Sequence, residues 1–193
     1  MCGIAGFIGD CQQPLVSLKE MAKSIYHRGP DDQGIWFDEQ RGIGLAHTRL
    51  SILDLSPAGH QPMESISGQY MMVFNGEIYN HQTIKNELNN ISSINWCGHS
   101  DTETLLAGFE AWGIKETIEK AIGMFAIAVW DRSANTLTLV RDRIGEKPLY
   151  YGWQDDTFLF GSELKALKQH TAFKSEINRD AITLLLRHYY IPT

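Results

Sequence analysis

The sequence predicts an α+β domain in which antiparallel sheets pack against helices. The period of the apolar residues switches repeatedly between two and about 3.6, so strands and helices are mixed along the chain. Strand-like runs occur mostly as neighbours joined by short polar turns, with few strand–helix–strand crossovers, which favours antiparallel pairing. A length of 193 residues and a hydrophobic fraction of 43% suit one packed domain, with or without a short tail.

The first half of the chain predicts strands around one amphipathic helix. Residues 4–8 predict a strand, and apolar residues then recur at helical spacing, namely Leu15, Leu18, Met21, Ala22 and Ile25. A Gly-Pro-Asp sequence ends that helix, and two short strands are expected near residues 34–37 and 42–47. The β-rich run 70–74 ends at Asn75-Gly76, a dipeptide that by itself predicts a tight hairpin turn.

Two helices are expected in the middle of the chain. A polar helix covers residues 81–89. The spacing of Ser100 and Glu103 is that of a capping box, which predicts the start of a second helix. The buried side of this second helix carries Leu105, Leu106, Phe109 and Trp112.

Two hairpins and a final helix complete the predicted elements. Residues 124–130 and 136–140 form the first hairpin, and residues 149–151 and 157–160 form the second. A capped helix over residues 178–189 places Ile182, Leu185 and Leu186 on one side. No closing element follows it, so we expect the chain to be part of something longer.

The composition argues against several functional classes. The formal net charge is −6, and the 17 Lys and Arg residues are scattered without a basic run, so we expect no nucleic-acid partner. No run approaches the ~20 apolar residues of a membrane span, and no signal peptide is recognisable. Three cysteines without a CxxC pair indicate a reducing, cytoplasmic location. The histidines lack the spacing of a metal site, so no metal is expected.

Cysteine at position 2 is the most unusual feature of the sequence. A small residue there allows the initiator methionine to be removed, which leaves Cys2 with a free α-amino group. An amine with a pKa of roughly 7.7–8.0 can then act as general base toward the thiol of the same residue. Taken alone, however, a free cysteine is more often a small hydrophobic residue without a chemical role.

A series of sequence blocks spans nearly the whole chain, namely residues 1–6, 27–31, 45–54, 75–80, 100–103, 141–151 and 162–167. Together they resemble the class II glutamine amidotransferases, which are N-terminal-nucleophile (Ntn) hydrolases with a processed cysteine. Within that superfamily, Arg49-Leu50-Ser51-Ile52 followed by Gly59-His60-Gln61-Pro62 is similar to the asparagine synthetases.

The resemblance implies a fold and a domain organisation. The expected fold is a four-layer αββα Ntn-hydrolase sandwich of two antiparallel sheets flanked by helices. Residues 2–177 would form the glutaminase domain, and residues 178–193 would begin the linker to a C-terminal synthetase domain that is absent here. ATP and Mg²⁺ belong to that missing domain, so no cofactor is expected in this one. The full-length form can be a homodimer.

The resemblance also implies the catalytic residues. Cys2 would be the nucleophile, while the Asn75 amide and the Gly76 backbone N–H would form the oxyanion hole. Such donors are typically worth about 10²–10³ in kcat.

Binding of L-glutamine is assigned to a second group of residues. Arg49 would bind the α-carboxylate in bidentate geometry, and Glu77 and Asp101 would bind the α-ammonium. Leu50 and Ile52 would line the pocket. Taken alone, Arg49 suits a surface ion pair, Asp101 suits a first-turn acid favoured by the helix dipole, and Glu77 suits a solvated turn residue.

The expected activity is hydrolysis of L-glutamine to glutamate and ammonia, which the absent domain would use to convert aspartate to asparagine. Three alternatives remain open. The ammonia can serve another acceptor, such as a surface-polysaccharide or secondary-metabolite intermediate. The domain can be a catalytically silent glutamine-binding or regulatory module, or a docking module in which Met1 is retained.

Overall fold

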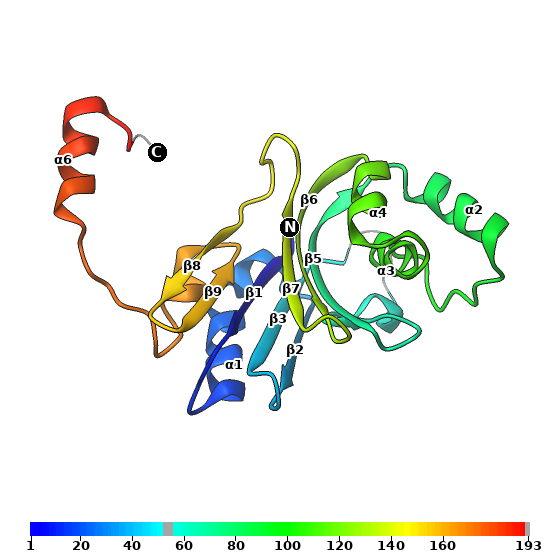
Figure 1. Ribbon diagram of the computed structural model, residues 1–193, viewed down its shortest axis with the longest axis horizontal. Helices are drawn as coiled ribbons and strands as arrows, with labels where there is room; N and C mark the ends of the chain where they lie inside the picture. Colours follow the sequence, from blue (N-terminus) through cyan, green and yellow to red (C-terminus); the bar gives the residue numbers. More distant parts are fainter. Residues whose placement is uncertain (52–55, 192–193) are drawn as a thin grey trace.

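Two antiparallel sheets stacked face to face form the centre of the computed structural model, and helices cover both outer faces (Figure 1). The structure describes residues 1–51 and 56–191. One sheet, sheet A, has the strand order β2-β3-β1-β9-β8, and the other, sheet B, has the order β4-β5-β6-β7. Sheet A consists of β1 (Gly3–Ile8), β2 (Asp32–Asp38), β3 (Ile43–Arg49), β8 (Tyr150–Gln154) and β9 (Thr157–Gly161). Sheet B consists of β4 (Met63–Glu64), β5 (Tyr70–Ile78), β6 (Gly123–Asp131) and β7 (Thr136–Arg141).

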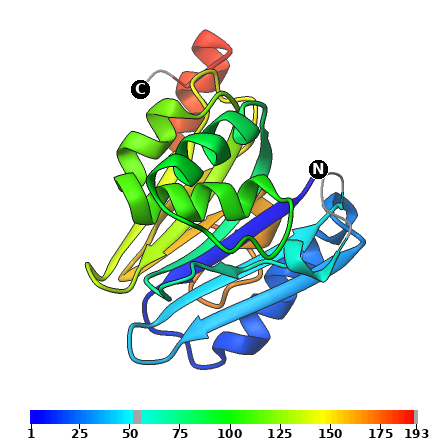
Figure 2. The same cartoon turned by 90° about the vertical axis from the view of Figure 1, so that its right-hand side faces the viewer.

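Helices lie on the two outer faces. The described helical segments are α1 (Pro14–Ser24), η1 (Tyr26–Arg28), η2 (Pro57–Gly59), α2 (His81–Ile91), α3 (Asp101–Trp112), α4 (Ile114–Lys120), α5 (Leu164–Leu167) and α6 (Arg179–His188). Figure 2 shows α2, α3 and α4, in green, lying together over sheet B. None of the described helices has the length and apolarity needed to cross a membrane.

Three apolar clusters hold the four layers together. The cluster between the sheets contains Ile4, Ile43, Leu45, Met71, Val73, Ala126, Ala128, Trp130 and Phe160. The outer face of sheet A packs Ala5 and Phe7 against Leu18 and Met21 of α1, whereas the outer face of sheet B packs against α2 and α3. Successive strand residues point to opposite faces, so each strand serves two clusters at once. The predicted αββα order is therefore confirmed.

Most predicted elements are present, and Ser100 and Asn178 cap α3 and α6 as expected, although only the Ser100 half of the predicted capping box forms. Ser100 Oγ accepts a hydrogen bond from the Glu103 N–H at 3.2 Å, which starts α3. The carboxylate of Glu103 accepts from the N–H groups of Cys97 and Gly98 instead of turning back to Ser100. Asn178 Oδ1 likewise accepts from the Ala181 N–H at 3.0 Å and caps α6.

The turn predicted at Asn75-Gly76 is wrong. Strand β5 continues through both residues to Ile78, with Asn75 opposite Ala126 and Gly76 opposite Phe125 of β6. Pairing along the whole of β6 overrides the local turn preference of the Asn-Gly dipeptide. Short segments β4, α4 and α5 were not predicted, because none of them is long enough to establish a period.

His47 joins the two sheets close to the end of the inter-sheet core. Its Nε2 lies 3.1 Å from the Phe74 carbonyl oxygen, and because a carbonyl only accepts, Nε2 carries the proton. Its Nδ1 is buried without a hydrogen-bond partner in the described part of the chain. Burial lowers the pKa of His47 to about 3, so the ring is neutral in the folded protein.

We predict that His47 makes the protein less stable as the pH falls below about 6.5. The unfolded chain binds a proton at this ring near that pH, whereas the folded ring stays neutral down to a pH of about 3. The unfolded state therefore binds more protons in this window, and the free energy of unfolding should fall by up to about 1.4 kcal/mol per pH unit.

Urea denaturation at several pH values measures this slope. His47→Gln keeps a donor for Phe74 and should flatten it. Part of the slope should remain, because burial also lowers the pKa of His170. The matched control is His188→Gln in the exposed helix α6, which should leave the slope unchanged. Equal slopes in wild type and His47→Gln would contradict the assignment of this pH dependence to His47.

Candidate functional site

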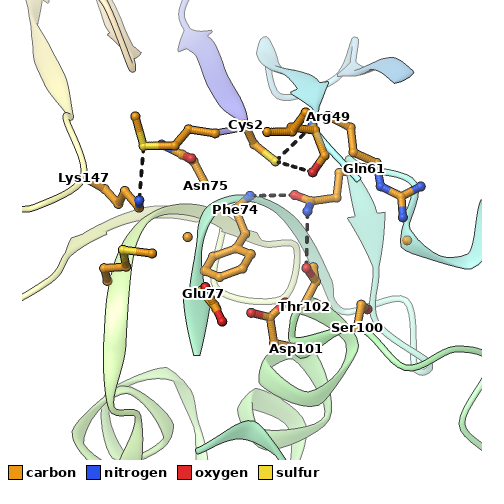
Figure 3. Close-up of a pocket in the computed structure, with 15 residues that line it drawn as sticks. Cys2, Arg49, Gln61, Phe74, Asn75, Glu77, Ser100, Asp101, Thr102 and Lys147 are labelled. Atoms are coloured by element: carbon orange, nitrogen blue, oxygen red, sulfur yellow. Dashed lines mark hydrogen bonds between the residues drawn. The ribbon is translucent and has the colours of Figure 1, made fainter. Parts of the chain in front are cut away.

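A pocket of about 100 Å³ opens where the apolar rows between the two sheets end (Figure 3). Side chains alternate between the two faces of a strand. The side chains at this end of the inter-sheet cluster, on the same strand faces as its members, are therefore those of Cys2, Arg49, Asn75 and Glu77. The pocket is lined by Met1, Cys2, Arg49, Leu50, Gly59, Gln61, Phe74, Asn75, Gly76, Glu77, Ser100, Asp101, Thr102, Met124 and Lys147. Seven of the eight predicted site residues therefore line one pocket. Ile52, the eighth, lies outside the described residues.

Cys2 is held at the mouth of the pocket by the neighbouring strand and by η1. Its Sγ accepts a hydrogen bond from the Leu50 N–H at 3.4 Å and lies 3.7 Å from the Leu50 carbonyl, to which it donates. Its carbonyl accepts from Arg28 Nε at 3.0 Å. Burial raises the pKa of the Cys2 thiol, opposed by the Leu50 hydrogen bond and by the positive charges of the chain terminus and Arg49. Deprotonation of this thiol therefore requires a nearby base.

Glu163 in turn fixes Arg28. Arg28 Nη1 donates to Glu163 Oε1 at 2.9 Å, and His27 and Lys165 contact the same carboxylate. Burial acts to raise the pKa of Glu163, but hydrogen bonds from Arg28, Lys165 and His27 lower it to about 2. The blocks at residues 27–31 and 162–167 thus meet in space and support the backbone of the cysteine.

The outer edge of β5 carries three backbone N–H groups that point the same way and belong to alternate residues of the strand. The Phe74 N–H donates to Gln61 Oε1 at 2.6 Å, and the Ile78 N–H donates to Asp101 Oδ2 at 2.9 Å. In an antiparallel ladder alternate residues direct their N–H groups to the same edge, so the Gly76 N–H points the same way between them. Phe125 lies opposite Gly76, but its N–H donates to Asp142 Oδ2 and its carbonyl accepts from the Asp142 N–H. Phe125 therefore uses its backbone groups on the side away from β5, which agrees with this orientation of the Gly76 N–H. Strand β4 pairs only with Met71 and Met72, so it does not cover the Gly76 N–H.

Asn75 contributes a donor from its side chain. Asn75 is only 1% exposed, and its Nδ2 has no hydrogen-bond partner among the described residues. A buried amide N–H without a partner costs roughly 1–3 kcal/mol, so the group is expected to meet a ligand oxygen or water. The amide of Asn75 and the N–H of Gly76 are consecutive donors at the same pocket.

Arg49 is buried at the end of β3, on the far side of Cys2 from Lys147 in the view of Figure 3. Its Nη1 donates to the Ser56 carbonyl at 3.0 Å. A side chain at Gly59 would place its Cβ 2.1 Å from Arg49 Nη2, so glycine at this position leaves room for the guanidinium. The chain therefore holds the buried side chain of Arg49 in the wall of the pocket.

Two acidic side chains line the floor of the pocket. Asp101 is buried at the first turn of α3, and burial raises its pKa against the opposing hydrogen bond from Ile78. Glu77 lies within β5 and is partly exposed, so its interpretation as a turn residue is wrong. The pocket thus combines two cations, Arg49 and Lys147, with two carboxyl groups, which suits a ligand that carries both an anionic and a cationic group.

Gln61 and Lys147 are site residues that sequence reasoning did not assign. Gln61 bridges the two walls of the pocket, since its Oε1 accepts from Phe74 and its Nε2 donates to Thr102 Oγ1 at 3.3 Å. Both residues lie in sequence blocks that carried the resemblance, and this was the available signal. No group of three His, Cys, Asp or Glu in the described ranges is placed to hold a metal ion.

A family model described as a glutamine amidotransferase domain matches residues 1–193, the whole chain. The chain belongs to the glutamine amidotransferase domain family. This confirms the family that the sequence blocks predicted.

Curated relatives of this amidotransferase domain include several asparagine synthetases. Putative asparagine synthetase [glutamine-hydrolyzing] 2 of Methanocaldococcus jannaschii is 36% identical over 100% of this chain and 40% of its own length. Asparagine synthetase [glutamine-hydrolyzing] 2 of Bacillus subtilis is 39% identical over 92% of this chain and 24% of its own length. The chain thus spans between 24% and 40% of these two relatives.

Solved structures support the fold of the amidotransferase domain. Glutamine phosphoribosylpyrophosphate amidotransferase from B. subtilis superposes with a TM-score of 0.73 at 21% identity, over 86% of this chain and 43% of that one. A second structure, the allosteric regulatory enzyme of purine biosynthesis, gives a TM-score of 0.72 at 22% identity, over 87% of this chain and 43% of that one. The predicted four-layer αββα fold is therefore confirmed.

We predict that replacing Gln61 by methionine destabilises the domain by about 1–3 kcal/mol. Methionine is similar in shape but leaves the Phe74 N–H without its acceptor and removes the link to Thr102. Thermal or urea unfolding measures the loss. The control is Gln169→Met, because the exposed amide of Gln169 donates to the Lys165 carbonyl four residues earlier. This variant should change stability by less than about 0.5 kcal/mol. Equal stability of the two variants would show that the Gln61 bridge contributes nothing.

Proposed function

We propose that this domain hydrolyses L-glutamine to glutamate and ammonia, with Cys2 as the nucleophile. The observation that carries the proposal is the unpartnered amide of Asn75 next to the uncovered Gly76 N–H, in the pocket that contains Cys2. Two preorganised donors beside a partly buried thiol suit the developing negative oxygen of an acyl-transfer intermediate.

The reaction begins after removal of Met1, which leaves the amine on Cys2 itself. The amine takes the thiol proton, and the thiolate attacks the carboxamide carbon of glutamine. The Asn75 Nδ2 and the Gly76 N–H hold the resulting oxyanion, and the α-ammonium of Cys2 gives its proton to the departing ammonia. Water then attacks the thioester and releases glutamate, which restores the thiol and the amine.

Substrate orientation follows from the charges at the two ends of the pocket. Arg49 binds the α-carboxylate of glutamine, and Asp101 with Glu77 binds the α-ammonium. Leu50 contributes its backbone to hold Cys2. Ile52 stays a predicted lining residue. The domain needs no cofactor or metal for these steps.

We propose that the ammonia is used within a longer protein, an asparagine synthetase whose C-terminal domain uses ATP and Mg²⁺. Its relatives of that name support this choice. A cytoplasmic location suits the three free cysteines. Another acceptor is the alternative, since a relative named amidase chry2 from Gibberella zeae is 36% identical over 86% of this chain.

The boundary that we propose lies near residue 177, with residues 178–193 leading into the next domain. Helix α6 projects from the body of the domain in Figure 1, and none of its residues is buried. Its apolar side carries Ile182, Leu185 and Leu186, which are 43%, 45% and 75% exposed. An uncovered apolar face of this kind suits packing against a partner domain.

Intact mass and glutamine turnover test the proposal directly. We predict that the protein loses Met1 and releases glutamate, and that Cys2→Ala, which is also processed, releases none. Cys97→Ala is the control, because Cys97 is an exposed free cysteine outside the pocket. A processed and folded protein that binds glutamine without hydrolysing it would contradict the proposal for this chain and favour a silent binding module. Retention of Met1 would favour a docking module.

A further inference from the structure

Lys147 is a buried cation that the mechanism above does not use. Its side chain lines the same pocket as Cys2, and the residue is only 5% exposed. Its Nζ donates a hydrogen bond to the Met1 sulfur at 3.2 Å (Figure 3). Within residues 1–51 and 56–191 no carboxylate lies within ion-pair distance of this ammonium. A thioether is a weak acceptor, so removal of Met1 would take away the partner that Nζ has here.

The loop that carries Lys147 is built to hold it in this position. Asp142 Oδ2 accepts from the backbone N–H of Lys147 at 2.9 Å and from that of Phe125 at 3.2 Å, and its Oδ1 accepts from Glu146 at 2.8 Å. Arg141 Nε donates to the Lys147 carbonyl at 2.7 Å. The sequence block at residues 141–151 therefore fixes the backbone of one lysine with several hydrogen bonds. That backbone directs a long cationic side chain into a pocket.

The ammonium lies close to the group that becomes the general base. Met1 is covalently bonded to the Cys2 nitrogen and also contacts Nζ, so standard bond lengths place that nitrogen within about 10 Å of Nζ. A positive charge at this range favours the neutral amine over the ammonium and the thiolate over the thiol. Among the described residues, the other charged groups that line the pocket or contact Cys2 are Arg28 from η1, Arg49 from β3, Glu77 from β5 and Asp101 from α3.

We propose that Lys147 is a positioning residue whose ammonium, once Met1 is removed, keeps the Cys2 amine neutral and stabilises the Cys2 thiolate. Arg49 acts on the Cys2 thiol in the same sense as Lys147 but is assigned to the substrate carboxylate, while the carboxyl groups of Asp101 and Glu77 act in the opposite sense. The positive charge of Lys147 therefore offsets the effect of these two carboxyl groups on the Cys2 thiol. The proposal deepens the proposed function and rests on it, because it concerns the same nucleophile.

The pH dependence of Cys2 alkylation by iodoacetamide tests this in the processed protein. Peptide mapping by mass spectrometry follows Cys2 separately from Cys97, which serves as an internal reference. In Lys147→Met, which keeps apolar volume but removes the charge, the midpoint for Cys2 should move up by about one pH unit. Lys147→Arg keeps the charge and should restore most of the shift. Lys115→Met, at a side chain that is 90% exposed, should leave the midpoint unchanged.

This readout separates failure of the inference from failure of the proposed function. Alkylation reports on the thiol even if the protein hydrolyses no glutamine, so an absence of turnover would overturn only the proposed function. An unchanged midpoint in Lys147→Met would overturn the role of Lys147, whether or not the variant is less stable. A raised KM for glutamine with an unchanged midpoint would also overturn it, since that result assigns Lys147 to substrate binding.

Discussion

The uncovered edge of β5 is the constraint on which the rest of the site depends. Strand β4 is only two residues long, so β5 runs past it and presents backbone donors that no strand pairs. Unpaired backbone donors in a buried place are costly, and the chain meets two of them with side chains, Gln61 at Phe74 and Asp101 at Ile78. The Gly76 N–H between them is the donor that we propose for the oxyanion. Gln61 and Asp101 therefore stabilise this edge and lie on either side of the Gly76 N–H.

Stacking of the two sheets explains how residues far apart in the sequence meet at this edge. Rows of apolar side chains fill the space between the sheets and change to polar residues at one end, where Cys2, Arg49 and Asn75 lie. Glycine is needed where the backbone itself is crowded. A Cβ at Gly76 would lie 2.3 Å from the Met124 carbonyl oxygen, so the close approach that glycine permits is to strand β6. The geometry of the donor is thus set by the packing behind it.

Much of this arrangement could be predicted from the sequence, because the strands and helices have clear periods and the sequence blocks identify the family. The Asn75-Gly76 turn was wrong because a short-range preference gave way to long-range pairing. The polar residues Asn75 and Glu77 alternate with the apolar residues Phe74 and Ile78, and this alternation was the available signal for a continuing strand. The roles of Gln61 and Lys147 could not be predicted, since each depends on a loop folding back onto distant elements.

The most direct test of the account is the effect of Asn75→Ala on single-turnover hydrolysis and on glutamine affinity in the processed protein. If the Asn75 amide stabilises the oxyanion, the rate should fall by about 10²–10³ while the dissociation constant for glutamine changes little. The truncation removes an amide whose Nδ2 has no hydrogen-bond partner among the described residues, so the fold should tolerate it. A rate within a few-fold of wild type would contradict the assignment of this edge of β5 as the oxyanion hole.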